Sequence, residues 1–81
     1  MARSVKYVIK QRARTRVESP MRLDDLGLSR INEVELVKDL EDAFEIEIVE
    51  LDWIYCSTVA DVERLVRQLR AEQFRELGEI S

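Results

Sequence analysis

The sequence predicts an all-α fold, a small antiparallel bundle of three main helices and one short helix. Apolar residues recur every three or four positions along three segments, which is the period of a helix with one buried face. One proline and two glycines in 81 residues are too few for a loop-rich β-sandwich. A single alternating run, residues 45–51, has no second strand to pair with, and an isolated strand is unstable in water. We therefore expect one domain over residues 1–81 with one modest core.

The first helix is expected over residues 5–16. Val5, Val8 and Ile9 repeat at helical spacing, and polar or basic residues fill the gaps. The stretch 17–25 contains the only proline and is predicted to be a loop between helices. Four apolar side chains in and after this loop are expected to lie against the core without regular structure: Met21, Leu23, Leu26 and Leu28.

A second helix of about 15 residues is predicted to begin after Ser29, a favourable N-cap residue. Asn32 and Glu35 repeat the spacing of a capping box one turn later. The expected apolar face is the stripe Ile31, Val34, Val37, Leu40 and Phe44, with Leu36 and Ala43 at its margins. Glu35, Asp39 and Asp42 lie within about 60° of one another on the opposite side. The helix is therefore predicted to have an apolar inner face and an acidic outer face.

Residues 45–51 are predicted to connect this helix to a short helical turn at residues 50–55. The turn contains Trp53, Ile54 and Tyr55, for which the sequence leaves two roles open. In the first, the three side chains fill the space between helices. In the second, they form an exposed contact for a partner or for a dimer. We favour core packing.

The last helix is predicted to begin at Thr58, because Thr58 and Asp61 have the spacing of a capping box. Its apolar stripe consists of Val59, Val62, Leu65, Val66 and Leu69. We expect it to continue to Phe74 or Leu77 and to stop at Gly78.

The composition argues against an enzyme. Histidine is absent, which removes the usual general base near neutral pH and the commonest transition-metal ligand. The single cysteine, Cys56, has no partner for an internal disulfide and is predicted to be a packing residue in a reducing compartment. Asp24, Asp25 and the acids of residues 45–50 have no histidine and no glycine-bearing calcium loop beside them. We therefore expect neither a hydrolase nor a metal site there.

Charge is distributed unevenly along the chain, whose formal net charge is −4. Residues 1–22 hold seven basic residues and one acidic residue, whereas residues 31–50 hold eight acidic residues and one basic residue. The basic segment lacks interleaved aromatic residues beyond Tyr7, and the acidic remainder repels phosphate, so no nucleic-acid partner is expected. No apolar run approaches the ~18 residues of a membrane span. We expect a cytoplasmic protein, most simply a monomer, without membrane contacts.

Residues 25–37 have the sequence DLGLSRINEVELV. This run resembles the signature of acyl carrier proteins, in which Asp-Leu-Gly precedes an Asp-Ser-Leu triplet and a helix that begins near Val-Glu-Leu-Val. Further matches follow in the same register at residues 40–44, 47–48 and 57–59. The resemblance covers residues 23–69 and implies the helical fold of that family. Outside it lie a short basic first helix with its loop at residues 1–22 and a C-terminal extension at residues 70–81.

The serine that carries phosphopantetheine in acyl carrier proteins is replaced in this chain. In register, Ser29 stands at the family's Asp, Arg30 at its Ser and Ile31 at its Leu. Arginine cannot accept a phosphodiester. In one interpretation Ser29 is modified one position early, because a helix N-terminus stabilises an attached phosphate. In the other, Ser29 is a plain N-cap, and the chain keeps the fold but has lost the phosphopantetheine arm.

The resemblance also implies an acidic docking face at Glu35, Glu41 and Asp42, and Asp39 adds a fourth acid to the same side of the helix. Carrier proteins dock such positions on basic patches of their enzymes, and the charge raises encounter rates and fixes orientation. We therefore expect a non-enzymatic protein of fatty-acid, polyketide or related biosynthesis that docks on a biosynthetic or modifying enzyme. The alternative is a regulatory adaptor that uses the carrier fold without acyl chemistry and binds through Glu35, Asp39 and Asp42.

Overall fold

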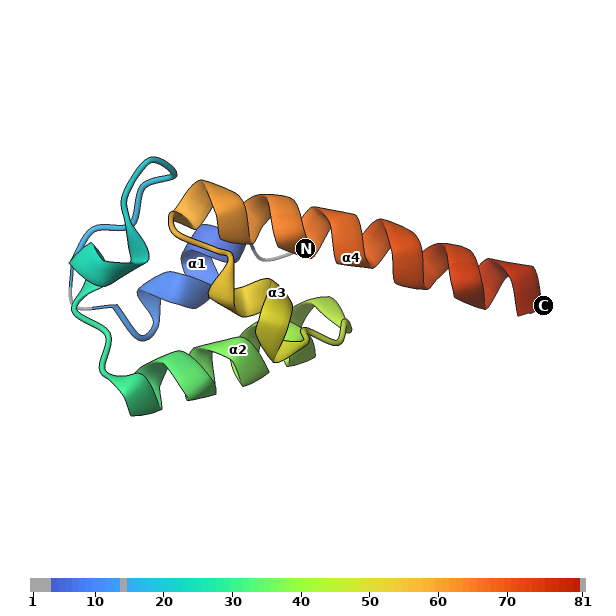
Figure 1. Cartoon of the computed structure of the whole chain (residues 1–81), viewed down its shortest axis with the longest axis horizontal. Coiled ribbons are helices and arrows are strands. Elements are labelled where there is room, and N and C mark those ends of the chain that lie inside the picture. Colours follow the sequence, from blue (N-terminus) through green and yellow to red (C-terminus); the bar gives the residue numbers. More distant parts are fainter. Residues whose placement is uncertain (1–3, 14, 81) are drawn as a thin grey trace.

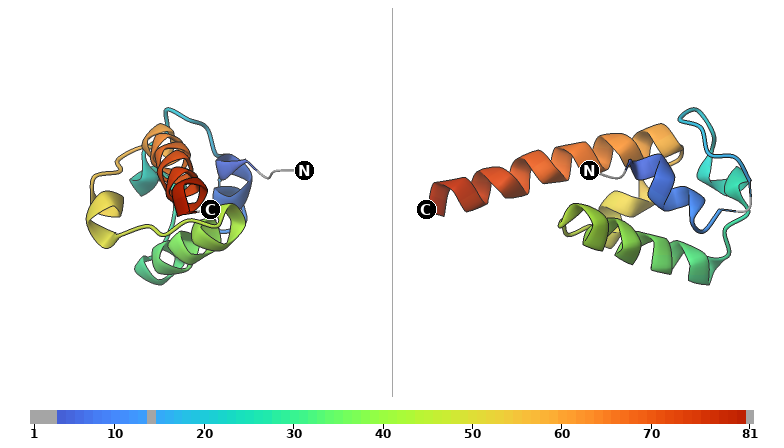
Figure 2. Two further views of the ribbon diagram at one scale, coloured as in Figure 1. Left: turned by 90° about the vertical axis from the view of Figure 1, so that its right-hand side faces the viewer. Right: turned by 180° about the vertical axis from the view of Figure 1, so that it is seen from behind.

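The computed structural model describes residues 4–13 and 15–80, with the backbone alone over 75–80 (Figure 1). These residues form helices α1 (Val5–Lys10), η1 (Leu23–Leu26), α2 (Arg30–Phe44), α3 (Glu50–Ile54) and α4 (Val59–Ile80), of which η1 is a 3-10 helix. The described part of the chain contains no strand and one isolated antiparallel bridge, so the all-α prediction is confirmed. In Figures 1 and 2, α2 and α4 run in the same direction and α1 runs opposite to both. Among these three main helices, only α1 is antiparallel to the others.

Helix α1 is shorter than the sequence predicts. It begins after Ser4, whose Oγ accepts a hydrogen bond from the Tyr7 N–H at 3.1 Å, and it ends at Lys10 rather than near residue 16. Residues 11–16 include one apolar side chain, Ala13, and so have no apolar face whose burial would stabilise a longer helix. Residue 14 lies outside the described residues.

The start of α2 is as predicted, but only one of its two expected caps forms. The Oγ of Ser29 accepts a hydrogen bond from the Asn32 N–H at 3.1 Å. The second capping box, between Asn32 and Glu35, is wrong because both residues already lie inside the helix. At the other end Glu45 adopts the left-handed conformation (φ 54°, ψ 50°) that closes many helices, a role usually taken by glycine.

The buried face of α2 differs from the predicted stripe. Leu36, expected at the margin, is fully buried, and Leu40 and Phe44 continue the same face into the core. Ile31 and Val34, expected inside, are 71% and 56% exposed. Two overlapping sets of α2 residues have helical spacing: the predicted stripe with Ile31 and Val34, and the stripe of Leu36, Leu40 and Phe44. Helices α1 and α4 pack against α2 on the side of Leu36, Leu40 and Phe44. Ile31 and Val34 are therefore left on the surface.

Backbone hydrogen bonds pin the long loop before α2 to the start of α4. The Leu23 N–H donates to the Ser57 carbonyl and the Val59 N–H donates to the Met21 carbonyl, both at 2.9 Å. Leu23 and Leu26 are buried as predicted, but they lie in η1 and not in irregular chain. The turn after η1 needs the left-handed backbone of Gly27 (φ 69°), and it aims the chain into α2.

The connection and the short helix α3 match the sequence prediction. Residues 45–49 form no strand, and Ile46 and Ile48 from this connection lie in the core. Helix α3 then spans Glu50–Ile54 and stands beside α2.

The capping box predicted for α4 is present. The Asp61 N–H donates to Oγ1 of Thr58 at 3.2 Å, and Oδ2 of Asp61 accepts from the N–H groups of Ser57 and Thr58 at 2.9 and 3.1 Å. The bonds from the Ser57 and Thr58 backbones hold the pKa of the Asp61 carboxyl below its usual range. The cap therefore keeps its charge, and with it the full strength of these bonds, down to acidic pH.

Helix α4 is longer than expected and projects from the bundle. The prediction that Gly78 stops it is wrong, because the helix continues to Ile80. A glycine inside a helix costs about 1 kcal/mol relative to alanine, which weakens a helix without breaking it. The second half of α4 extends past the other helices (Figures 1 and 2), and there Arg70 stacks over the Phe74 ring at 5.3 Å from its centroid.

Candidate docking and attachment site

The N-terminus of α2 presents both residues that the resemblance singles out. Ser29 is the N-cap and Arg30 is the first helical residue, and both are exposed. A 15-residue helix directs its N-terminal N–H groups and its positive dipole end toward this spot. The Ser29 hydroxyl accepts the Asn32 N–H, so its oxygen already has a structural role. Arg30 makes no ion pair within the described residues.

Two of the four predicted docking acids are held by Arg12. Nη1 of Arg12 lies 2.5 Å from Oε2 of Glu35, and Nε lies 2.6 Å from Oδ2 of Asp39. A further bond of 3.3 Å joins Nη2 to Oδ1 of Asp39, which makes this contact bidentate. Hydrogen bonding to Asp39, followed by the charges of Asp39 and Glu35, raises the pKa of the Arg12 guanidinium. The chain after α1 thus neutralises part of the acidic face of α2.

The other two predicted docking acids differ from each other in their surroundings. Oε2 of Glu41 accepts the Ile48 N–H at 2.9 Å, so this carboxylate helps to hold the connection before α3. Asp42 is exposed and makes no ion pair within the part of the chain that the structure describes. Asp42 is therefore the member of the acidic set that is most accessible to a partner.

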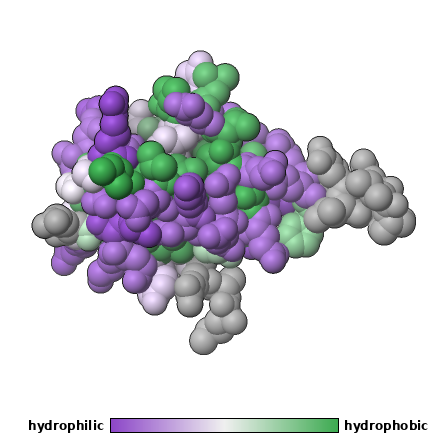
Figure 3. All heavy atoms as spheres, turned by 90° about the horizontal axis from the view of Figure 1, so that it is seen from below, coloured by the Kyte–Doolittle hydropathy of each residue, from purple (hydrophilic) through white to green (hydrophobic). Residues whose placement is uncertain are grey.

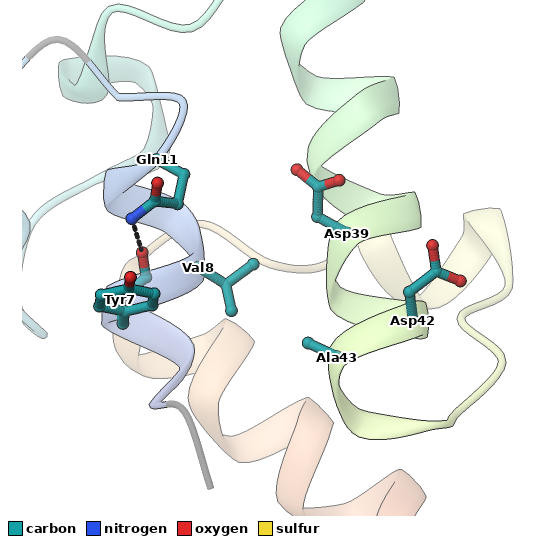
Figure 4. A pocket seen from close by; sticks show the side chains of 6 residues that line it. All are labelled: Tyr7, Val8, Gln11, Asp39, Asp42 and Ala43. Atoms are coloured by element: carbon teal, nitrogen blue, oxygen red, sulfur yellow. Dashed lines mark hydrogen bonds between the residues drawn. The ribbon is translucent and has the colours of Figure 1, made fainter. Parts of the chain in front are cut away.

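A shallow hollow of about 400 Å³ lies between α1 and α2 (Figure 4). Asp39, Asp42 and Ala43 line it from α2, whereas Tyr7, Val8 and Gln11 line it from the α1 side. In Figure 4 the two carboxylates stand on the α2 wall, across from the Gln11 side chain, whose Nε2 donates to the Tyr7 carbonyl at 3.5 Å. The hollow gives the acidic face a concave part that periodicity alone does not predict.

A larger open groove of about 590 Å³ runs between α2 and α3. Its lining consists of Arg30, Glu33, Val34, Val37, Lys38, Glu41, Ile48, Glu50, Trp53 and Ile54. Trp53 is partly buried and its Nε1–H donates to Oε1 of Glu33 at 3.3 Å. Ile54 and Tyr55 are 65% and 77% exposed, so the prediction of core packing is wrong for these two.

Two exposed apolar side chains line this groove, Val34 on α2 and Ile54 on α3. Four further apolar side chains on or next to α2 and α3 are exposed without lining it: Ile31, Val49, Leu51 and Tyr55. In the view from below, hydrophobic (green) residues gather in places among hydrophilic (purple) ones on the surface (Figure 3). Scattered exposed apolar residues are ordinary, but a cluster beside a groove is typical of an interaction surface.

Cys56 packs against the core as predicted. It is partly buried, and its Sγ contacts the Asp52 carbonyl at 3.6 Å. Burial, followed by the charges of Asp61 and Asp52, raises the pKa of the Cys56 thiol. A raised pKa disfavours the reactive thiolate. In the described residues no three His, Cys, Asp or Glu side chains are grouped so that they could hold a metal ion.

Comparisons with family models, with curated proteins and with solved structures found no match to the chain. Among the described helices, none combines the length and the apolar character that a membrane span requires.

Proposed function

We propose that this protein is an acyl-carrier-like, non-enzymatic protein of the cytoplasm that acts by docking α2 onto a biosynthetic or modifying enzyme. The observation that carries the proposal is the exposed N-terminus of α2. It lies two residues after the left-handed turn at Gly27 and exposes Ser29 and Arg30. The sequence resemblance aligns Arg30 with the modified serine of acyl carrier proteins, and the exposure of this position supports the proposal. The in-register matches of residues 23–69 to that family support the same conclusion.

In this proposal the phosphopantetheine arm has been lost. Arg30 occupies the position of the modified serine and has no hydroxyl to accept the phosphodiester. The Ser29 hydroxyl lies one residue earlier, displaced by about 3.8 Å along the backbone, and already serves as the cap of α2. A transferase that requires a positioned hydroxyl is sensitive to such a shift.

The second candidate function is a regulatory adaptor with no link to acyl chemistry. The exposed apolar side chains of Val34 and Ile54 in the α2–α3 groove favour it, because they offer a contact that needs no acyl group. Of the acids expected to bind the adaptor's partner, Asp42 is accessible, whereas Arg12 pairs with Glu35 and Asp39. Apolar side chains around the α2–α3 groove would then supply most of the contact. The two candidates differ in whether an enzyme that modifies carrier domains recognises the chain.

Direct binding to a broad-specificity phosphopantetheinyl transferase tests the proposal. We expect measurable binding at about 0.05 M salt that weakens strongly toward about 0.5 M, because exposed charges are screened. Asp42→Lys is expected to weaken binding by about three- to tenfold at low salt. The matched control is Glu72→Lys on α4, which reverses an exposed acid away from α2. Absence of binding, or equal losses in both variants, would count against docking through α2.

A further inference from the structure

The groove-facing side of α2 carries a symmetric pattern of charge and apolar residues. Arg30, Val34, Val37 and Glu41 are separated by four, three and four positions, and all four line the α2–α3 groove. This is the spacing of the seam residues in a helix that packs lengthwise against another helix. The stripe begins with a cation, ends with an anion and has two valines between them.

The stripe is complementary to a second copy of itself that runs in the opposite direction. Arg30 and Glu41 are equally distant from the middle of the stripe, and so are Val34 and Val37. If a second α2 lies antiparallel to the first, each Arg30 therefore faces the Glu41 of the other copy, and each Val34 faces a Val37. A twofold axis satisfies both ends of the contact at once, as in isologous dimers.

The local environment leaves these groups available for a second copy. Arg30 is exposed and forms no ion pair within the described ranges. Glu41 uses Oε2 for the Ile48 N–H, and among the residues that the structure describes Oε1 has no hydrogen-bond partner. Ile31 and Ile54 flank the stripe and are mostly exposed, so a second helix placed there would cover apolar surface that water now contacts.

We infer that this face is the interface of a homodimer in which the two α2 helices pack antiparallel, with Arg30–Glu41 ion pairs at both ends and the valines between them. Trp53 and Ile54 form the other wall of the groove that receives the second helix. A contact of one helix per subunit lies at the low end of specific interfaces, about 1,200 Å² or less in total. The dimer is therefore weak and depends on protein concentration. This inference goes beyond the proposed function and does not depend on it.

Sedimentation equilibrium of the 81-residue protein up to about millimolar concentration tests the dimer. The unmodified chain is expected to sediment as a monomer–dimer equilibrium. Arg30→Glu places two carboxylates together at each end and Glu41→Arg places two guanidinium groups there. Each variant alone is expected to dimerise at least about tenfold more weakly. An equimolar mixture restores opposite charges at both ends and is expected to regain dimer as a heterodimer.

Rescue in the mixture also shows that both variants are folded, which matters because Glu41→Arg removes the bond to the Ile48 N–H. The matched control is Lys6→Glu, which makes the same change of charge as Arg30→Glu at an exposed position of α1. It is expected to leave the dimer unchanged. The inference is overturned if the unmodified chain is a monomer throughout, or if the mixture associates no better than the single variants. It also fails if Lys6→Glu weakens association as much as Arg30→Glu.

Discussion

Leu36→Ala is expected to lower the free energy of unfolding by about 2–5 kcal/mol, whereas Val34→Ala is expected to change it by less than about 0.5 kcal/mol. Leu36 is fully buried against the packed helices, and its truncation leaves a cavity. Val34 is 56% exposed on the groove side, where truncation leaves no enclosed space. Urea unfolding followed by circular dichroism measures both values.

The size of this difference matters for a chain of 81 residues. A domain of this length has a total stability of about 4–12 kcal/mol, so loss of Leu36 leaves a small margin. The sequence periodicity predicts the opposite order, with Val34 in the core stripe and Leu36 at its edge. Equal losses in the two variants, or a larger loss for Val34→Ala, would contradict the observed rotation of α2.

Arg30→Ser is expected to convert the chain into a substrate for phosphopantetheine attachment. The substitution places a hydroxyl at the first residue of α2, the position that the proposed resemblance aligns with the modified serine of acyl carrier proteins. The helix dipole at this end stabilises the phosphate that is added. Incubation with coenzyme A and a broad-specificity transferase, followed by intact-mass measurement, should show one phosphopantetheine per chain.

Two control variants locate the modification. Arg30→Ala removes the arginine without supplying a hydroxyl and is expected to gain no mass. Arg30→Ser combined with Ser29→Ala is expected to remain a substrate, although loss of the cap costs about 1 kcal/mol of stability. Gain of mass in Arg30→Ala would mean that Ser29 is the acceptor and that Arg30 merely hinders it. No gain in any variant would favour the adaptor.

Local signals predicted where most helices begin. Ser29 and Thr58 are capping residues whose side chains satisfy N–H groups within a few positions, so the information lies in neighbouring sequence. The lack of a partner strand likewise predicted the irregular connection at residues 45–49. The exposure of Ser29 and Arg30 also follows from the predicted start of α2, because both residues lie at the N-terminus of that helix.

Features that depend on contacts between distant residues could not be predicted from local sequence patterns. Which stripe of α2 is buried depends on where α1 and α4 pack, and both stripes have helical spacing. The pairing of Arg12 with Glu35 and Asp39 joins residues more than 20 positions apart. No local sequence pattern around Arg12 or around the two acids indicates that they pair. Val34 lines the α2–α3 groove because it lies on the exposed side of α2 and not in the core. The end of α4 was missed because one glycine is too weak a stop signal.

We propose that the chain docks as a carrier protein does but carries no phosphopantetheine arm, and a competition assay tests both parts of this proposal together. An ordinary acyl carrier protein, coenzyme A and a limiting amount of transferase are mixed with increasing amounts of the unmodified chain, and the intact masses of both proteins are followed. We predict that modification of the ordinary carrier slows as this chain is added, while the mass of this chain stays constant. An undiminished rate at large excess of this chain, or a gain of one phosphopantetheine on it, would contradict the proposed function.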